Sequence, residues 1–142
     1  MQLDGDVLKT PSAILKLLEI GLTIIIISVS QGVELFIFGK DFPSTTFFCG
    51  GVLVTGAVVS CLLLATYLTG SAREIQKTPF EVMVNAVLAV LMVSAGTVTI
   101  YNAFKYALSS EAADAAKTAG TFAIINSVFY GLDTYFASQN ME

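Results

Sequence analysis

The chain alternates long apolar runs with short polar connections. The apolar runs lie at about residues 13–38, 47–68, 82–104 and 118–136, and each has roughly the 20 residues that an α-helix needs to cross the hydrocarbon core of a bilayer. Short connections make consecutive helices antiparallel neighbours. The pattern therefore predicts an all-α fold, an integral membrane up-down-up-down four-helix bundle, formed as a single domain over residues 1–142.

The start of the fourth helix has two interpretations. The segment before its apolar run is rich in alanine, with Ser110 as a candidate N-cap and with Glu111 and Asp114 in the first turn, where negative charge suits the helix dipole. On this interpretation the helix covers residues 110–136 and extends a turn or two out of the membrane. The alternative is a solvated hairpin loop that ends near residue 117.

The start of the third helix carries a stronger signal. Thr78 is a candidate N-cap, Pro79 occupies the first helical position, and Glu81 completes a capping box. The same Lys-Thr-Pro triplet begins at Lys77 and, before the first helix, at Lys9. A lysine just before a helix opposes the helix dipole, so we attribute both lysines to the positive-inside rule, which predicts that both termini are cytoplasmic.

The composition agrees with a membrane protein and excludes several functions. Apolar residues make up 55% of the chain and charged residues 13%, about half the charge of a typical soluble domain. The net charge of −4 argues against nucleic-acid binding. The chain has no histidine, and Cys49 and Cys61 lie too far apart on one helix to form a disulfide. We expect no enzymatic activity, no cofactor, no metal site and no small-molecule substrate.

Polar residues inside the predicted spans point to contacts between helices, because each one is costly in lipid unless a neighbour satisfies it. Lys16 and Glu19, one turn apart, fall near the cytoplasmic side, as do Asn85 and Asp133, whereas Asn126 falls near the middle of its span. We expect these five residues to form an interhelical polar cluster, since ionisable groups in membranes usually face the bundle interior and pair there.

A proton or ion path is the functional alternative for the same groups. Such a path needs polar groups staged across the whole membrane. Between the expected cluster and Gln31 and Glu34, which fall near the opposite interface, mainly Asn126 is available. This gap favours the structural interpretation.

Small and aromatic residues indicate how the helices contact one another. Gly56, Ser60 and Gly96 allow close approach of helix backbones, and we favour packing inside the bundle over dimerisation for the first two. Phenylalanine is concentrated near the non-cytoplasmic ends of the helices, where it would act as an interfacial anchor or as a rim for lateral protein contacts. The candidate rim residues are Phe36, Phe38, Phe42, Phe47 and Phe48.

Residues 11–19 (PSAILKLLE), with the apolar run that follows, resemble the first helix of MARVEL-domain proteins. Residues 80–85 (FEVMVN) and 129–133 (FYGLD) are similar to the third and fourth helices of that family, so the resemblance covers nearly the whole chain. MAL-like, synaptophysin-like, occludin-like and insect snakeskin members of this family organise membrane apposition, vesicle traffic or cell junctions, including smooth septate junctions. The resemblance implies that Glu19, Asn85 and Asp133 stabilise the bundle.

Two functions of different classes remain open. The first is a non-enzymatic membrane-organising protein at a cell junction of the plasma membrane or on a vesicle membrane. It would act through lateral contacts with itself, with other integral membrane proteins and with lipids, sterol among them, because outer loops of about ten residues offer little surface for adhesion. The second is a channel or transporter subunit that uses the intramembrane carboxylates.

Overall fold

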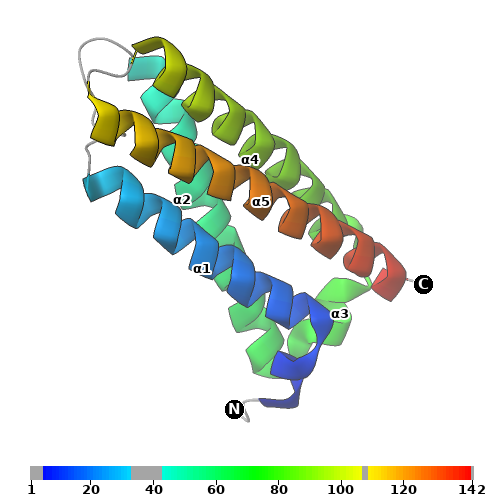
Figure 1. The fold of residues 1–142 in the computed structure, drawn as a ribbon. Coiled ribbons are helices and arrows are strands. Elements are labelled where there is room, and N and C mark those ends of the chain that lie inside the picture. The colour runs from blue at the N-terminus through cyan, green and yellow to red at the C-terminus, as the bar shows by residue number, and fades with distance from the viewer. Residues whose placement is uncertain (1–4, 33–42, 107–108, 142) are drawn as a thin grey trace.

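The computed structural model describes residues 5–32, 43–106 and 109–141, and long helices dominate it (Figure 1). The long helices are α1 (Pro11–Gly32), α2 (Pro43–Thr66), α4 (Pro79–Tyr106) and α5 (Ser110–Met141). The short elements are the 3-10 helix η1 (Gly5–Lys9), the π-helical turn η2 (Tyr67–Ser71) and α3 (Ala72–Gln76). The prediction of an all-α four-helix bundle is confirmed.

The four long helices run alternately in opposite directions. The N-terminus, α3 and the C-terminus share one end of the bundle (Figure 1), which we call the terminal end; the opposite end is the far end. Helix α5 packs between α1 and α4, and its contact with α4 is the most extensive one between helices. Helix α2 closes the bundle against α1 and α4.

The bundle is apolar on its outside and carries charged groups inside. Large apolar side chains such as Leu62, Met83 and Val90 are exposed, whereas Lys16 and Glu19 are fully buried. A water-soluble bundle has the opposite arrangement. Within residues 5–32, 43–106 and 109–141, three helical segments are long and apolar enough to cross a membrane: Pro11–Ser30, Ser44–Gln76 and Pro79–Lys105. The chain is therefore a multi-pass integral membrane protein.

Helix α5 is not among those three segments, because it carries more polar side chains than the other long helices. Its polar side chains face the bundle interior, where Asn126, Tyr130 and Asp133 are fully buried. Its outward face is apolar over the same stretch. The outward residues are Ile125, Val128, Leu132 and Tyr135. A helix with this inside-out pattern is compatible with lipid on its outer face, although its mean hydropathy is lower than that of the other long helices.

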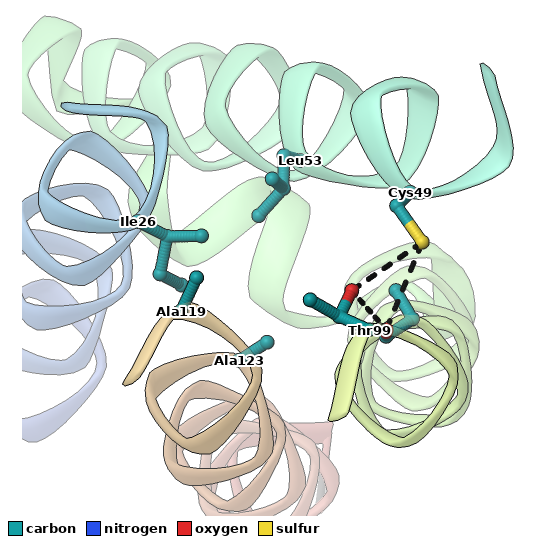
Figure 2. A pocket seen from close by; sticks show the side chains of 7 residues that line it. Ile26, Cys49, Leu53, Thr99, Ala119 and Ala123 are labelled. Carbon is teal, nitrogen blue, oxygen red and sulfur yellow. Dashed lines mark hydrogen bonds between the residues drawn. The ribbon is translucent and has the colours of Figure 1, made fainter. Parts of the chain in front are cut away.

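An apolar layer fills the bundle from its middle toward the far end. Ile26 of α1, Leu53 of α2, Met92 of α4 and Ala123 of α5 pack together there. A small cavity of about 10 Å³ lies in this layer, close to Cys49 (Figure 2), and it offers about enough room for one water-sized sphere. Its lining is almost wholly apolar, so it has too few polar groups to hold a water molecule or a polar ligand.

Glycines set how closely α4 and α5 approach. A Cβ atom on Gly96 would lie 2.7 Å from the carbonyl oxygen of Gly120, and one on Gly120 would lie 2.8 Å from that of Gly96. A Cβ atom on Gly56 of α2 would lie 2.7 Å from Met92 Cε and 3.0 Å from the Tyr130 hydroxyl. Gly56 therefore packs inside the bundle, as the sequence favours.

The helix starts differ in detail from the expected caps. Helix α4 begins at Pro79, but the capping box is wrong: the backbone N–H and the hydroxyl of Thr78 both donate to the carbonyl oxygen of Ile75, at 3.0 and 2.6 Å. The Glu81 carboxylate instead turns into the bundle and accepts a hydrogen bond from the Tyr67 hydroxyl. The buried contact with Tyr67 of η2 takes the place of the cap at this position.

The segment before the fourth apolar run is helical and not a solvated loop. Helix α5 begins at Ser110, but the capping hydroxyl belongs to Ser109, which accepts a hydrogen bond from the N–H of Ala112 at 3.2 Å. The N-cap is therefore Ser109, one residue before the predicted Ser110.

The connection between α2 and α4 is more structured than a plain loop. The π-helical turn η2 contains Gly70, whose φ of 83° lies in the left-handed region that favours glycine. This residue redirects the chain from α2 into α3, and α3 leads back to the start of α4. The turn also carries Tyr67, which packs with Ala13 and Ala72 in a small apolar cluster at the terminal end.

Candidate functional site

Lys16 lies at the centre of a buried network that joins three helices. Its ammonium group donates a hydrogen bond to Asn85 Oδ1 of α4 at 2.7 Å and contacts Glu19 Oε2, on its own helix α1, at 3.1 Å. It also forms an ion pair with Asp133 of α5. The side chains of all three charged residues are fully buried. These contacts use the three protons of the ammonium group.

The spacing of residues along two helices creates this arrangement. On α1, Lys16, Glu19 and Thr23 are three and four residues apart, so they lie on one face of the helix. On α5, Asn126, Tyr130 and Asp133 follow a similar spacing. Because α1 and α5 run side by side and antiparallel, Lys16 meets Asp133 near the terminal end and Thr23 meets Asn126 deeper in the bundle.

Asn85 joins α4 to both charged partners. While its carbonyl oxygen accepts the hydrogen bond from Lys16, its amide nitrogen donates to Asp133 Oδ2 at 3.1 Å. A neutral amide can bridge a cation and a carboxylate in this way because it carries both an acceptor and a donor.

Helix α2 enters the network through a hydroxyl group. Ser60 donates a hydrogen bond to Glu19 Oε2 at 2.8 Å, and its oxygen lies 2.9 Å from the Tyr130 hydroxyl. The Tyr130 hydroxyl also lies 3.2 Å from the carbonyl oxygen of Gly56. In addition, the Lys16 ammonium lies 5.5 Å from the centre of the Tyr130 ring, within the range of a cation–π interaction. All four long helices thus contribute to one network.

Asn126 forms the deepest part of the network. Its amide nitrogen donates to Thr23 Oγ1 at 3.0 Å and to the carbonyl oxygen of Glu19 at 3.3 Å. One turn further along α1 the face becomes apolar at Ile26, which belongs to the apolar layer. The polar network therefore occupies the terminal half of the bundle and stops near its middle.

A second polar contact lies closer to the terminal end. The Tyr67 hydroxyl donates to the Glu81 carboxylate, and both side chains are fully buried. Glu81 lies one turn before Asn85 on the same face of α4, so this contact extends the polar interior toward the terminal end.

The structure brings the five residues of the expected polar cluster into a single network. The network also includes four residues with a weaker signal in the sequence. Ser60 is predicted only to pack, Glu81 is predicted to cap α4, and the sequence pattern makes no prediction for Tyr67 and Tyr130. The helical spacing of Tyr130 between Asn126 and Asp133 is a signal that could have identified it.

The expected aromatic rim is described only in part. Phe47 and Phe48 lie at the far end of α2, with 68% and 37% of their surfaces exposed. Tyr101 and Phe104 of α4, which lie toward the same end, are also exposed. Phe36, Phe38, Phe42 and Glu34 lie outside the described residues, and the side chain of Gln31 does as well.

Ion pairs and hydrogen bonds hold the network together. Its one lysine is committed to three oxygen atoms, and its carboxylates are held by groups on neighbouring helices. Among the residues that the structure describes, no three His, Cys, Asp or Glu side chains are grouped so that they could hold a metal ion. The arrangement is suited to fixing the relative positions of helices inside lipid.

Comparisons with protein-family models, with curated proteins and with solved structures gave no match to this chain. The function is therefore inferred from the geometry of the bundle and from the sequence.

Proposed function

We propose that this chain is a non-enzymatic membrane-organising protein, a four-transmembrane domain of the MARVEL type that acts through lateral contacts at a cell junction or on a vesicle membrane. One observation carries the proposal: the buried polar groups of the bundle pair with one another, and the outward surface is apolar. Such a protein has little polar surface with which to bind a soluble substrate, but it can associate with lipids and with other membrane helices.

The pairing of Lys16 supports a structural role for the network. A transport site must release and rebind its ligand, whereas Lys16 is surrounded by Glu19, Asn85 and Asp133 from three helices and is fully buried. Removing Lys16 would leave the carboxylates of Glu19 and Asp133 in a low-dielectric interior without a cation. The network is therefore suited to holding the helices in one arrangement.

The apolar layer also supports this role. A path for ions needs polar or water-lined surface across the whole membrane. Ile26, Leu53 and Met92 instead fill the middle of the bundle next to the polar network. The polar interior thus extends from the terminal end to about half the depth of the bundle.

The outward surface provides the area for lateral contacts. On α2 and α4 it consists largely of aliphatic side chains, and at the far end it includes Phe47, Tyr101 and Phe104. Aromatic residues at this level commonly sit at the membrane–water interface. In the proposal, the far-end aromatic residues form the contact with a second copy of the chain or with another integral membrane protein, and lipids cover the rest.

The topology of the proposal places α5 across the membrane as the fourth span, with both termini on the cytoplasmic side. Lys9, Arg73 and Lys77 are exposed near the terminal end. The positive-inside rule predicts such basic residues on the cytoplasmic side. Basic residues also lie toward the far end, where Lys105 and Lys117 sit over aromatic rings. Protease protection of epitope tags at the two termini in sealed membrane vesicles tests the orientation directly.

The native mass of the protein tests the function. The protein is extracted into lipid nanodiscs with its neighbours retained and is measured by native mass spectrometry. We expect a defined oligomer or a co-purifying membrane protein, and we expect Phe47→Ala to weaken that assembly. Phe80→Ala is the matched control, because Phe80 is also an exposed phenylalanine but lies at the terminal end. A monomer without partners would contradict the proposal.

The second candidate function is a channel or transporter subunit, and one observation favours it: among the residues that the structure describes, none donates a hydrogen bond to one buried oxygen atom each of Glu19, Glu81 and Asp133. Ion and proton flux into liposomes tests this candidate. If Asp133→Asn changes flux in an intact bundle, the transport function gains; if it impairs folding or assembly without any flux in the wild type, the scaffold function gains.

A further inference from the structure

Four buried oxygen atoms of the polar interior lack a hydrogen-bond donor within the described part of the chain. They are Glu19 Oε1, Glu81 Oε2, Asn126 Oδ1 and Asp133 Oδ1. The four residues are fully buried, and all four atoms are acceptors. Buried polar atoms are normally satisfied by protein groups or by ordered water, so this shared deficit calls for a source of donors.

Lys16 and Asn126 have no donor left for these four oxygen atoms. The three protons of Lys16 are directed to Glu19, Asn85 and Asp133. Both protons of the Asn126 amide are taken by Thr23 Oγ1 and the carbonyl oxygen of Glu19. If one of these protons turned toward an orphan oxygen atom, the oxygen atom that now accepts it would lose its donor.

The polar interior also has more carboxyl groups than cations. Glu19 and Asp133 flank the single ammonium group of Lys16, and Glu81 lies one turn of α4 away from Asn85. The groups that face Glu81 and the Lys16 network from α2, η2 and α5 are the hydroxyl groups of Ser60, Tyr67 and Tyr130, and none of them is a cation. Three carboxyl groups therefore share one cation, a composition that a dry apolar interior does not tolerate.

We propose that the polar network binds water molecules on the terminal-end side of the apolar layer, in a pocket that this layer closes toward the far end. Each water molecule supplies two donors, so at least two of them are needed to satisfy the four oxygen atoms. Water fits better than a divalent cation, because no three Asp, Glu or Cys side chains of the described chain converge on one point.

The position of the orphan atoms gives the pocket its direction. Glu81 lies near the start of α4 at the terminal end, Asp133 and Glu19 flank Lys16 in the next layer, and Asn126 is deepest. Beyond Asn126 the interior belongs to Ile26 and its apolar neighbours. The pocket thus hydrates half of the bundle without connecting the two sides of the membrane.

Water-to-protein nuclear Overhauser contacts test this proposal, measured by NMR on selectively labelled protein in nanodiscs of deuterated lipid. We expect cross-peaks from water to the rings of Tyr67 and Tyr130 and to the methyl group of Thr23. We expect none to the methyl groups of Ile26, which is the matched control because it lies one turn from Thr23 and is equally buried.

Three results would overturn the proposal. Absence of water contacts to Tyr67, Tyr130 and Thr23 would show a dry interior. Contacts to Ile26 as strong as those to Thr23 would show water throughout the bundle. Side-chain amide shifts of Asn85 and Asn126 that titrate with sodium chloride, but not with the chloride salt of a bulky organic cation, would assign the site to a metal cation.

A variant tests whether one of the water molecules lies at Glu81. Glu81→Leu removes one orphan acceptor, so we expect the water contact of Tyr67 to disappear and that of Tyr130 to persist. If this variant does not fold, the comparison of Thr23 with Ile26 in the wild type decides the question alone. The proposal does not rest on the scaffold function, since the native mass of the assembly and the hydration of the interior are measured separately.

Discussion

Lys16 of α1 and Asp133 of α5 form a fully buried ion pair between the first and the last long helix of the bundle. Asn85 of α4 contacts both residues, and Ser60 of α2 reaches the same network through Glu19. A single lysine therefore connects side chains from all four long helices, and its removal should affect the whole fold and not one contact.

We expect Lys16→Met to destabilise the bundle by about 3–5 kcal/mol, because it leaves buried carboxylates without a cation. Reversible unfolding in mixed detergent micelles measures the change. The control is Lys9→Met, since Lys9 forms only an exposed ion pair with Asp6, and such pairs contribute about 0–1 kcal/mol. Equal effects of the two substitutions would mean that the buried network does not stabilise the fold.

The contact between Gly96 and Gly120 gives a second prediction. Gly96→Ala places a Cβ atom 2.7 Å from a backbone oxygen, which cannot move aside as a flexible side chain could. We expect α4 and α5 to separate slightly and the stability to fall by about 1–3 kcal/mol, as measured by the same unfolding experiment.

Gly131→Ala is the matched control for this prediction. Gly131 lies on the outward face of α5 with open space around its Cα atom, so alanine should be neutral or should stabilise the helix by up to about 1 kcal/mol. A loss of stability at Gly131 as large as that at Gly96 would show that close approach of α4 and α5 is not the cause.

The hydrogen bond from Tyr67 to Glu81 gives a third prediction. Tyr67→Phe keeps the ring in its apolar cluster but removes the one donor that the described structure provides to the Glu81 carboxylate. A buried acceptor that loses its donor typically costs about 1–3 kcal/mol. We expect a lower unfolding midpoint for this variant, whereas Tyr101→Phe, at an exposed position of α4, should leave the midpoint unchanged.

The two free cysteines should differ in reactivity. Cys61 is exposed on the outer face of α2, whereas Cys49 is buried and its sulfur lies 3.7 Å from the carbonyl oxygen of Ala95. In folded protein a lipid-soluble maleimide should add once, and Cys61→Ser should abolish the addition. Intact-protein mass spectrometry counts the additions; a second addition before unfolding would place Cys49 outside the core.

The helical architecture could be predicted from the sequence because apolar runs report directly which segments enter lipid. Helix boundaries were less accurate. Helix α2 begins four residues before its predicted start, at Pro43, and α5 extends to Met141 and not to residue 136. Both extensions are helical turns outside the apolar run, and hydrophobicity carries no information about them. The predicted extension of the first helix to residue 38 lies outside the described residues.

The members of the polar network could be predicted only where the residue type is itself unusual in a membrane. Lys16, Glu19 and Asp133 stand out because charges in a span require partners. Serine and tyrosine are common in membrane helices, so Ser60 and Tyr130 could not be told from packing residues without the geometry. Glu81 is predicted to form a local cap, because the sequence places its tertiary partner Tyr67 inside the second apolar run and gives no sign of a contact between the two.

The order of the helices along the chain also bears on how the protein enters a membrane. Helix α1 carries its lysine together with Glu19, three residues away, so it can pass into lipid as a nearly neutral segment. Helix α5 is the least apolar long helix and carries Asp133 without a basic residue nearby on its own face. Because α5 follows the other three long helices in the chain, the partners of Asp133, Lys16 and Asn85, are synthesised before it. We therefore expect the Asp133 carboxylate to have its partners available when α5 joins the bundle.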